Sequence, residues 1–215
     1  MIEIVPAIIP ETKTQLEEEI KKISKFARLV QIDVSDGIFT SIKTWPYITG
    51  EKISWPENIN IEVHLMVDRP EEKVSDWIDS GVKSIVAHIE ATNNFQKVID
   101  ICRRHSVSVG VAIKPSTDIS KLEPFVFKVD FIQIMGNDEL GKHGVELDPR
   151  AVERIKMLRA MYSESIIAVD IGVSEDTAQV LVSAGANKLI SGSAILDADN
   201  PEKVFRYFES LSDIR

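Results

Sequence analysis

Short apolar runs alternate with amphipathic stretches eight times along this chain of 215 residues. Most of the apolar runs have no polar face, as expected of parallel strands that helices cover on one side and a packed interior covers on the other. The amphipathic stretches repeat their apolar residues every three or four positions, which is the period of a helix. Eight strand–helix units predict an α/β fold, a TIM (β/α)8 barrel in a single domain over residues 1–215. A doubly wound open sheet is the alternative, which the lack of a G-x-G-x-x-G segment after the first run disfavours.

The bounds of these elements follow from capping residues, glycines and prolines. We expect strands at residues 2–9, 30–35, 59–66, 82–89, 107–113, 129–135, 165–171 and 188–191. We expect helices at residues 12–23, 70–81, 94–105, 118–126, 149–162, 174–184 and 201–211, with Thr12, Asp148 and Ser174 as caps. Residues 38–58 should be irregular, with a short helix between the pairs Trp45-Pro46 and Trp55-Pro56.

Charge and composition narrow the classes of partner. The net charge is -9 and there is no long basic block, which argues against nucleic acid as the main partner. Cys102 is the single cysteine, so no intrachain disulfide can form and a reducing cytoplasm is expected. No apolar run is long enough to span a membrane, and the N-terminus lacks the features of a signal peptide. We therefore expect a cytoplasmic homo-oligomer that binds a small molecule, and neither nucleic acid nor a membrane.

The strand at 30–35 carries a carboxylate in a buried setting. Gln31, Asp33 and Ser35 share one face of it, and the strand ends at Asp36-Gly37. A buried carboxylate is costly unless it is paired or bound to a metal, so Asp33 is a candidate site residue. An aspartate that bonds nearby backbone in a turn is the alternative.

Function in a barrel belongs at the C-terminal ends of the strands, where inward side chains face each other. Asp33, His64 and Asp170 end three strands, and two carboxylates with an imidazole can bind a divalent metal. Gln31 can add a neutral carbonyl oxygen. Two opposed carboxylates also suit a reaction that removes a proton from one face of a carbon and returns one to the other. Taken singly, His64 fits a core histidine, and Asp170 fits a cap for the helix near Ser174.

Glycines after the last two strands predict a phosphate site. Gly172, Gly192 and Ser193 lie where barrels often hold a phosphate on backbone N–H groups, although tight turns explain the glycines equally. Met66 and Met135 are expected to line the cup, as substrate contacts or as core filler.

These residues together resemble the ribulose-phosphate 3-epimerase family over nearly the whole chain. The motifs that carry the resemblance are Asp33-Val34-Ser35-Asp36-Gly37, Val63-His64-Leu65-Met66, His88-Ile89-Glu90-Ala91-Thr92, Val169-Asp170-Ile171-Gly172-Val173, Gly185-Ala186-Asn187 and Gly192-Ser193-Ala194. The resemblance implies a ribulose-phosphate-binding TIM barrel, and a metal-dependent isomerase of carbohydrate metabolism in the pentose phosphate pathway. It implies that Asp33 and Asp170 are acid/base residues and metal ligands, with His64 as a further ligand. It also implies that Met66 and Met135 flank the enediolate and that Gly172, Gly192 and Ser193 hold phosphate.

The sequence departs from the family pattern at several site positions. The family has a histidine ligand where Gln31 stands and a phosphate-contacting glycine where Ile171 stands. The family's Asn-Pro after the fifth strand is Lys114-Pro115, and Lys114 brings a charge that can meet a phosphate or pair with a carboxylate. The loop at 136–144 is also different, and its Gly141 and Gly144 are candidate substrate contacts. Further changes are Ala7 for a serine and Ser35 for a methionine.

The loss of one imidazole affects the expected cofactor. A carboxamide oxygen is a hard neutral donor, so Gln31 should weaken zinc binding and favour harder ions. The cofactor is expected to be a divalent ion, with Zn, Fe, Mn, Co and Mg as candidates.

Three functions fit this pattern. The leading one is a sugar-phosphate 3-epimerase, and the second is a diverged, non-catalytic sugar-phosphate-binding paralogue. The third is another phosphate-binding barrel enzyme, such as a decarboxylase or an indole-forming lyase. It is disfavoured because no Asp-x-Lys-x-x-Asp pattern occurs at Asp33. Fold alone cannot choose among them.

Overall fold

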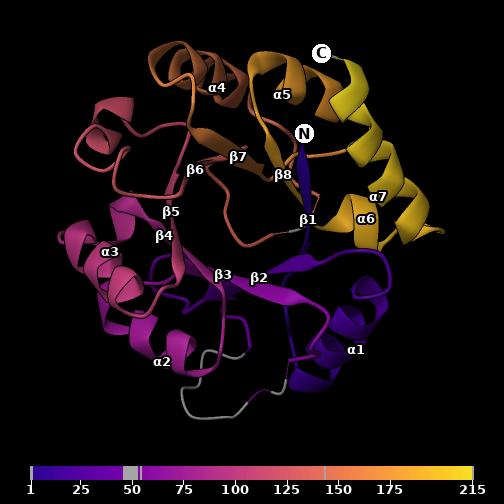
Figure 1. Cartoon of the computed structure of the whole chain (residues 1–215), viewed down its shortest axis with the longest axis horizontal. Helices are drawn as coiled ribbons and strands as arrows, with labels where there is room; N and C mark the ends of the chain where they lie inside the picture. The colour runs from indigo at the N-terminus through magenta and orange to yellow at the C-terminus, as the bar shows by residue number, and fades with distance from the viewer. Residues whose placement is uncertain (1, 46–52, 54, 143, 215) are drawn as a thin grey trace.

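The chain folds into a closed barrel of eight parallel strands in sequence order, β1 to β8 (Figure 1). The computed structural model describes residues 2–45, 53, 55–142 and 144–214. The strands are β1 Glu3–Ile8, β2 Leu29–Ser35, β3 Asn60–Met66, β4 Ser84–His88, β5 Ser108–Ile113, β6 Phe131–Met135, β7 Ile166–Asp170 and β8 Lys188–Ser191. The predicted TIM barrel is confirmed. The short helix predicted between the two Trp-Pro pairs lies largely outside the described residues.

Helices form a ring outside the strands (Figure 1). The α-helices are α1 Lys13–Ile23, α2 Val74–Asp79, α3 Phe95–Arg104, α4 Pro149–Met161, α5 Ala178–Ala184, α6 Ser193–Leu196 and α7 Pro201–Ser210. Short 3-10 turns occur at η1 Pro70–Glu72, η2 Ile89–Ala91, η3 Ile119–Leu122 and η4 Leu211–Ile214. None of the helices in the described part of the chain is long and apolar enough to cross a membrane.

Two of the predicted caps are present. Thr12 Oγ1 accepts a hydrogen bond from the backbone N–H of Gln15, and Asp148 Oδ1 accepts one from that of Arg150. Each bond satisfies one of the first N–H groups of a helix, which lack a partner within the helix. These caps fix where α1 and α4 begin.

Three predicted helices are shorter than expected. The helix predicted at 70–81 is divided into η1 and α2, because Lys73 N–H bonds back only three residues, to Pro70. The one predicted at 118–126 is reduced to η3, because Pro124 lacks the N–H that would continue the helical hydrogen bonds. The one predicted at 174–184 begins only at Ala178, and Ser174 does not cap it.

The start of α5 is set by Thr177 instead of Ser174. Thr177 Oγ1 accepts from the N–H of Ser174 at 2.9 Å and donates to the carbonyl of Gly172 at 2.6 Å. These bonds hold residues 172–177 in a turn, so the helix begins only at Ala178. The alternative role of Asp170 as a helix cap is therefore not supported, because the helix begins far from it.

Apolar packing occupies two layers. The outer layer lies between the strands and the helices, and it includes Ile32 and Val34 of β2. The inner layer fills the barrel, and it includes Met66, Phe131 and Met135. Successive residues of a strand point to opposite sides, so Gln31, Asp33 and Ser35 point inward, as the period of two predicts. The register that pairs Asp33 with His64 places both at the same height.

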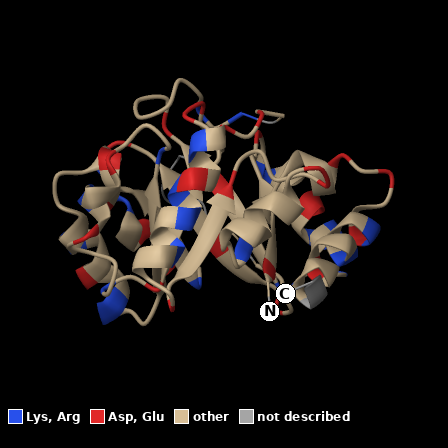
Figure 2. Cartoon of the chain, turned by 90° about the horizontal axis from the view of Figure 1, so that it is seen from above, with Lys and Arg blue, Asp and Glu red and all other residues tan. Residues whose placement is uncertain are grey.

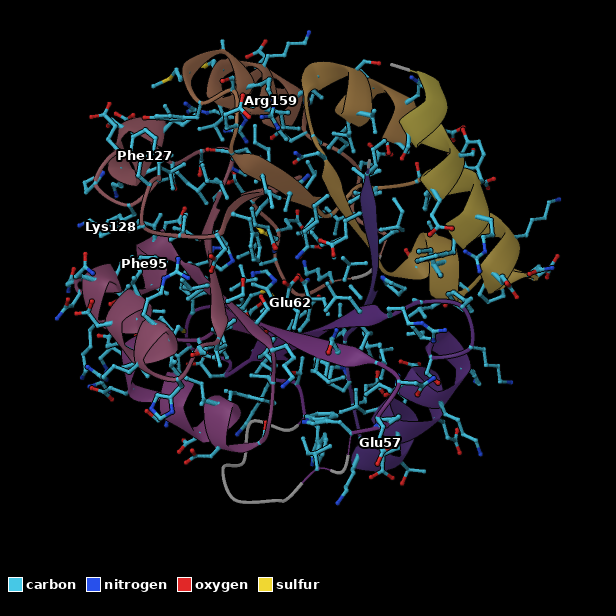
Figure 3. All side chains as sticks on the ribbon, viewed as in Figure 1. Glu57, Glu62, Phe95, Phe127, Lys128 and Arg159 are labelled. Atoms are coloured by element: carbon cyan, nitrogen blue, oxygen red, sulfur yellow. The ribbon has the colours of Figure 1, made fainter. Side chains whose placement is uncertain are left out.

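The N-terminal end of the barrel interior is closed by a buried ion pair. Lys188 Nζ lies 2.7 Å from Glu62 Oε2, and Ser84 Oγ donates to the same oxygen at 2.8 Å. Lys188 also lies over the Phe131 ring, 4.0 Å from its centre. Figure 3 labels Glu62 inside the ring of strands. In the described part of the chain, these side chains fill this end of the barrel, and Asp33 and Asp170 lie toward the opposite, C-terminal end.

Candidate active site

Asp33, His64 and Asp170 meet at the C-terminal end of the barrel. His64 Nδ1 lies 3.3 Å from Asp33 Oδ1 and 3.2 Å from Asp170 Oδ2. Each residue offers one ligand atom, and the three atoms lie within 4.8 Å of one another. All three residues are buried. The structure thus brings together the three residues that the sequence predicted to converge.

Gln31 bridges the two carboxylates from below. Its Nε2 donates to Asp33 Oδ1 and to Asp170 Oδ2, each at 2.9 Å. Gln31 is fully buried, and its Oε1 finds no hydrogen-bond partner among the described residues. A buried, unpaired amide oxygen is costly, so this side chain is suited to a second partner that an ion or ligand would supply.

Gln133 is a site residue that the sequence analysis missed. Its Nε2 donates to Asp170 Oδ2 at 3.0 Å and lies 3.5 Å from His64 Nδ1. Its Oε1 is also buried, with no partner in the part of the chain described. A signal was present in the sequence: a glutamine interrupts an apolar strand two residues before Met135, so both face inward.

The candidate ligand atoms have a spacing that one ion can span. His64 Nδ1 lies 3.3 Å from Asp33 Oδ1 and 3.2 Å from Asp170 Oδ2. Ligand atoms held about 2.1 Å from one ion lie about 3.0 Å apart in octahedral and about 3.4 Å apart in tetrahedral geometry. The donor set, two carboxylates and an imidazole with amide groups beside them, therefore fits a divalent ion.

A second histidine and a glutamate lie behind His64. His88 Nε2 is 3.0 Å from His64 Nε2, and His88 Nδ1 is 3.2 Å from Glu90 Oε2. The other oxygen of Glu90 accepts from Lys114 N–H at 2.8 Å and from Thr117 Oγ1 at 2.6 Å. The sequence analysis placed His88 at a strand end without assigning it a role. Its contact with His64 depends on how β3 and β4 are staggered.

Burial and neighbouring charges shift the pKa values of this cluster. Burial lowers the pKa of His64, but hydrogen bonds and charges from Asp170 and Asp33 outweigh it and raise the pKa to about 9. Burial lowers the pKa of His88 to about 4 against the opposing hydrogen bond of Glu90. Burial and the charge of Asp170 raise the pKa of Asp33. These shifts favour a protonated His64 while no ion is bound, and a neutral His88.

A cavity of about 770 Å³ opens above the acid pair. Its lining includes Asp33, Asp170, Met66 and Met135, whereas His64 and Gln31 are fully buried beneath. Gly141 and Gly144 line it from the loop after β6, and Gly172, Gly192 and Ser193 line it from the loops after β7 and β8. Backbone N–H groups of residues 172, 173, 192, 193 and 194 have no recorded partner within the described ranges. Such groups can hold an anion.

Ile171 lies in this wall in a strained conformation. Its φ is 78°, a left-handed value that is rare for a β-branched residue, and Gly172 follows with φ 71°. The carbonyl of Ile171 packs against Gly136, where a Cβ would lie 1.8 Å from that oxygen. The tight contact between the loops after β6 and β7 fixes the backbone here, and the Ile171 side chain narrows the cavity.

Lys114, a predicted site residue, belongs neither to the cavity lining nor to the cluster of Gln31 and His64 beneath it. Its Nζ lies 4.7 Å from the centre of the Phe39 ring, and Phe39 in turn packs against His88. Its backbone N–H holds Glu90. The structure therefore places Lys114 beside the His88–Glu90 pair.

Fold and site together define a class of protein: a (β/α)8-barrel enzyme with an acid pair at its mouth and backbone N–H groups turned to the same cavity. A model of the ribulose-phosphate 3 epimerase family matches residues 3–196. Ribulose-phosphate 3-epimerase of Schizosaccharomyces pombe is 30% identical over 205 residues, which cover 94% of this chain and 90% of that protein. The Bacillus subtilis ribulose-phosphate 3-epimerase is 28% identical over 221 residues, covering 100% and 99%. The chain belongs to the ribulose-phosphate 3-epimerase family.

Solved structures of other proteins share the fold. 3-hexulose-6-phosphate synthase from Salmonella typhimurium has a TM-score of 0.74 at 13% identity, with 98% of each chain covered. Orotidine 5′-monophosphate decarboxylase from Sulfolobus solfataricus has a TM-score of 0.65 at 12% identity, with 99% of each chain covered. At these identities the likeness shows the fold alone.

Proposed function

We propose that this chain is a sugar-phosphate 3-epimerase that interconverts the two C3 epimers of a ketose phosphate by proton transfer between two carboxyl groups. The observation that carries the proposal is the Asp33–Asp170 pair, joined through His64 and Gln31 at the floor of the cavity. Ribulose 5-phosphate is the first substrate to test, because the relatives' names specify ribulose phosphate.

The chemistry follows from how the two carboxyls are held. All side-chain contacts that the described residues make with Asp33 go to Oδ1, and all those with Asp170 go to Oδ2. The second oxygen of each carboxyl thus remains for the substrate in the cavity. One carboxylate takes the proton from C3, and the C–H electron pair forms the C2–C3 double bond of an enediolate. The other carboxyl then gives a proton to the opposite face of C3, which inverts that carbon.

One of the two carboxyls shows a shift that suits an acid. Burial and the charge of Asp170 raise the pKa of Asp33, which makes it easier for Asp33 to hold a proton in the metal-free protein. Met66 and Met135 line the cavity with side chains that lack strong hydrogen-bonding groups. Such walls keep water from donating a proton to the wrong face.

Asp33, His64 and Asp170 would hold a divalent ion, which stabilises the negative charge of the enediolate when bound. Gln31 would be a fourth, weaker ligand. Turning its amide over would bring the unpaired Oε1 to the position of Nε2, toward both carboxylates. The resulting shell has more hard oxygen donors than a two-histidine shell, which favours Mn²⁺, Fe²⁺, Co²⁺ or Mg²⁺ over Zn²⁺.

The substrate phosphate would bind the backbone N–H groups near Gly172, Gly192 and Ser193. Gly141 and Gly144 would cover it from the loop after β6. Lys114 would contribute through Glu90 and not by direct contact with phosphate, because it packs on Phe39.

Exchange of the C3 proton with solvent tests this function. The protein is incubated in D2O with ribulose 5-phosphate, then with other pentulose and hexulose phosphates, with and without added metal. Deuterium should enter C3, and Asp33→Asn and Asp170→Asn should each lower conversion by at least about 10²-fold. The absence of exchange with every substrate would instead favour the non-catalytic sugar-phosphate binder. Metal content of the purified wild type, measured in parallel, tests the ion.

Self-association and a cytoplasmic location remain predictions. Phe127 is 87% exposed, at the periphery in Figure 3, and packs edge-on against Tyr162, so it is a large apolar group open to a partner. Along the ribbon in Figure 2, positions of acidic residues alternate with positions of basic ones. Sedimentation velocity would measure the assembly.

A further inference from the structure

We infer that Glu90 and His88 are positioning residues that keep a proton on His64 Nε2, so that Nδ1, which faces the acid pair, is the nitrogen that gives up its proton to bind a metal ion. The inference rests on the metal part of the proposed function. It concerns two residues outside the acid pair, neither of which lines the cavity.

The orientation of the hydrogen bonds begins at Glu90. Two donors, Lys114 N–H and Thr117 Oγ1, occupy its Oε1 at 2.8 and 2.6 Å. Its Oε2 faces His88 Nδ1 at 3.2 Å. A carboxylate can only accept hydrogen bonds, so the proton of this contact must be on His88 Nδ1.

The orientation is then passed through His88. A neutral imidazole has one N–H, so when Nδ1 carries it, Nε2 must accept. His88 Nε2 lies 3.0 Å from His64 Nε2, with ring centres 5.0 Å apart and planes tilted by 23°, so one of these nitrogens donates to the other. His64 Nε2 must therefore be the donor. The remaining nitrogen, His64 Nδ1, faces the two carboxylates and is left as the ligand atom.

Burial keeps this chain of hydrogen bonds from being replaced by water. Both histidines have no exposed surface, and Glu90 is the only member near solvent, with 15% of its side chain exposed. Partners of this kind orient metal-bound histidines, and their removal typically lowers metal affinity by about 10–100-fold.

Glu90→Gln reverses the orientation without changing the shape of the side chain. The fixed N–H of Lys114 still requires an acceptor, so the amide oxygen must face it and the amide NH2 must face His88 Nδ1. His88 would then carry its proton on Nε2 and donate to His64 Nε2. That arrangement puts the His64 proton on Nδ1, where it blocks the ion.

Two readouts test the inference. Titration of Co²⁺ and Zn²⁺ against a competing chelator should show affinity reduced about 10–100-fold in Glu90→Gln. The ¹⁵N shifts of the imidazole nitrogens should show the His88 proton on Nδ1 in the wild type and on Nε2 in the variant. Glu146→Gln, an exposed carboxylate at the cavity rim, removes the same charge without touching the chain and should leave both readouts unchanged.

A second pair of variants keeps the Glu90 charge. His88→Gln can accept from His64 with its amide oxygen, and should retain affinity close to the wild type. His88→Leu offers no acceptor and should lose metal affinity. If Glu90→Gln does not fold, the comparison of these two His88 variants still tests the inference.

Wild-type affinity in Glu90→Gln with an unchanged His88 tautomer would overturn the inference, and so would equal loss in His88→Gln and His88→Leu. If the wild type binds neither ion, the metal part of the proposed function fails. The ¹⁵N shifts of metal-free protein still decide the position of the His88 proton.

Discussion

Ile171 offers a direct test of the strained wall. A residue with a Cβ costs about 1–2 kcal/mol in the left-handed conformation, which Ile171 adopts at φ 78°. Alanine at this position would still carry that strain, and glycine would not. At an ordinary position glycine is less stable than alanine by about 0.5–1 kcal/mol, because the unfolded chain gains freedom. The Ile171→Gly variant should therefore be more stable than Ile171→Ala by up to about 1 kcal/mol, the reverse of the usual order.

Thermal unfolding of the two metal-free variants measures this difference. For a chain of this length, about 1 kcal/mol corresponds to roughly 2–4 °C in Tm. Val173 is the matched control, because it is buried nearby without a positive φ. There the alanine variant should be the more stable one. If Ile171→Ala proves more stable than Ile171→Gly, the left-handed backbone at residue 171 is not a source of strain. The glycine variant should also bind inorganic phosphate more tightly, since the side chain that narrows the cavity is gone.

Three further changes have defined outcomes. Gln31→His should tighten Zn²⁺ binding with little change in Tm, because it adds an imidazole where the amide already contacts both carboxylates. A chelator competition measures this, and weaker binding would contradict the assigned geometry. The metal-free protein should lose stability in urea as the pH rises from 6.5 through about 9, because folding raises the pKa of His64 and the stabilisation is complete only below the unfolded value. The raised pKa of Asp33 also makes the stability of the metal-free protein fall as the pH rises. Ion binding, in contrast, should strengthen over this range, because the ion displaces the His64 proton. Gly136→Ala should destabilise the folded protein by at least about 3 kcal/mol, because its Cβ would meet the backbone oxygen of Ile171. Gly144→Ala has open space around the added Cβ and should cost only about 1–2 kcal/mol in the same assay, from its left-handed backbone alone.

Much of the site was predictable because a closed barrel brings the C-terminal ends of its parallel strands together at one mouth. Asp33, His64 and Asp170 could be grouped without knowing any contact, since each ends a strand and closure makes strand ends meet. Caps were predictable where a side chain acts on its own helix, as Thr12 does. The start of α5 was not, because Thr177 turns to bond Gly172 and Ser174 rather than the helix.

The contacts between strands were beyond the sequence. Gln133 shares a face with Met135, so its inward direction was predictable, but its contact with Asp170 of the neighbouring strand was not. The bond between His64 and His88 depends on register, since β3 pairs His64 with Val86 and leaves His88 two residues further on. Sequence alone does not fix that stagger. Pro124, in contrast, was a visible signal against a long helix at 118–126.

The barrel closes where β1 pairs with β8, and this seam has consequences for how the protein assembles. Asp33 is on β2 and Asp170 is on β7, so the acid pair straddles the seam. Gln31 donates a hydrogen bond to Asp170 across this seam, although the two residues are 139 positions apart in sequence. Contacts between such distant residues form late, because the chain must first lose the entropy of a long loop. An ion that binds these residues recognises only the closed barrel, so it should slow opening of the seam and leave the earlier steps of folding unchanged.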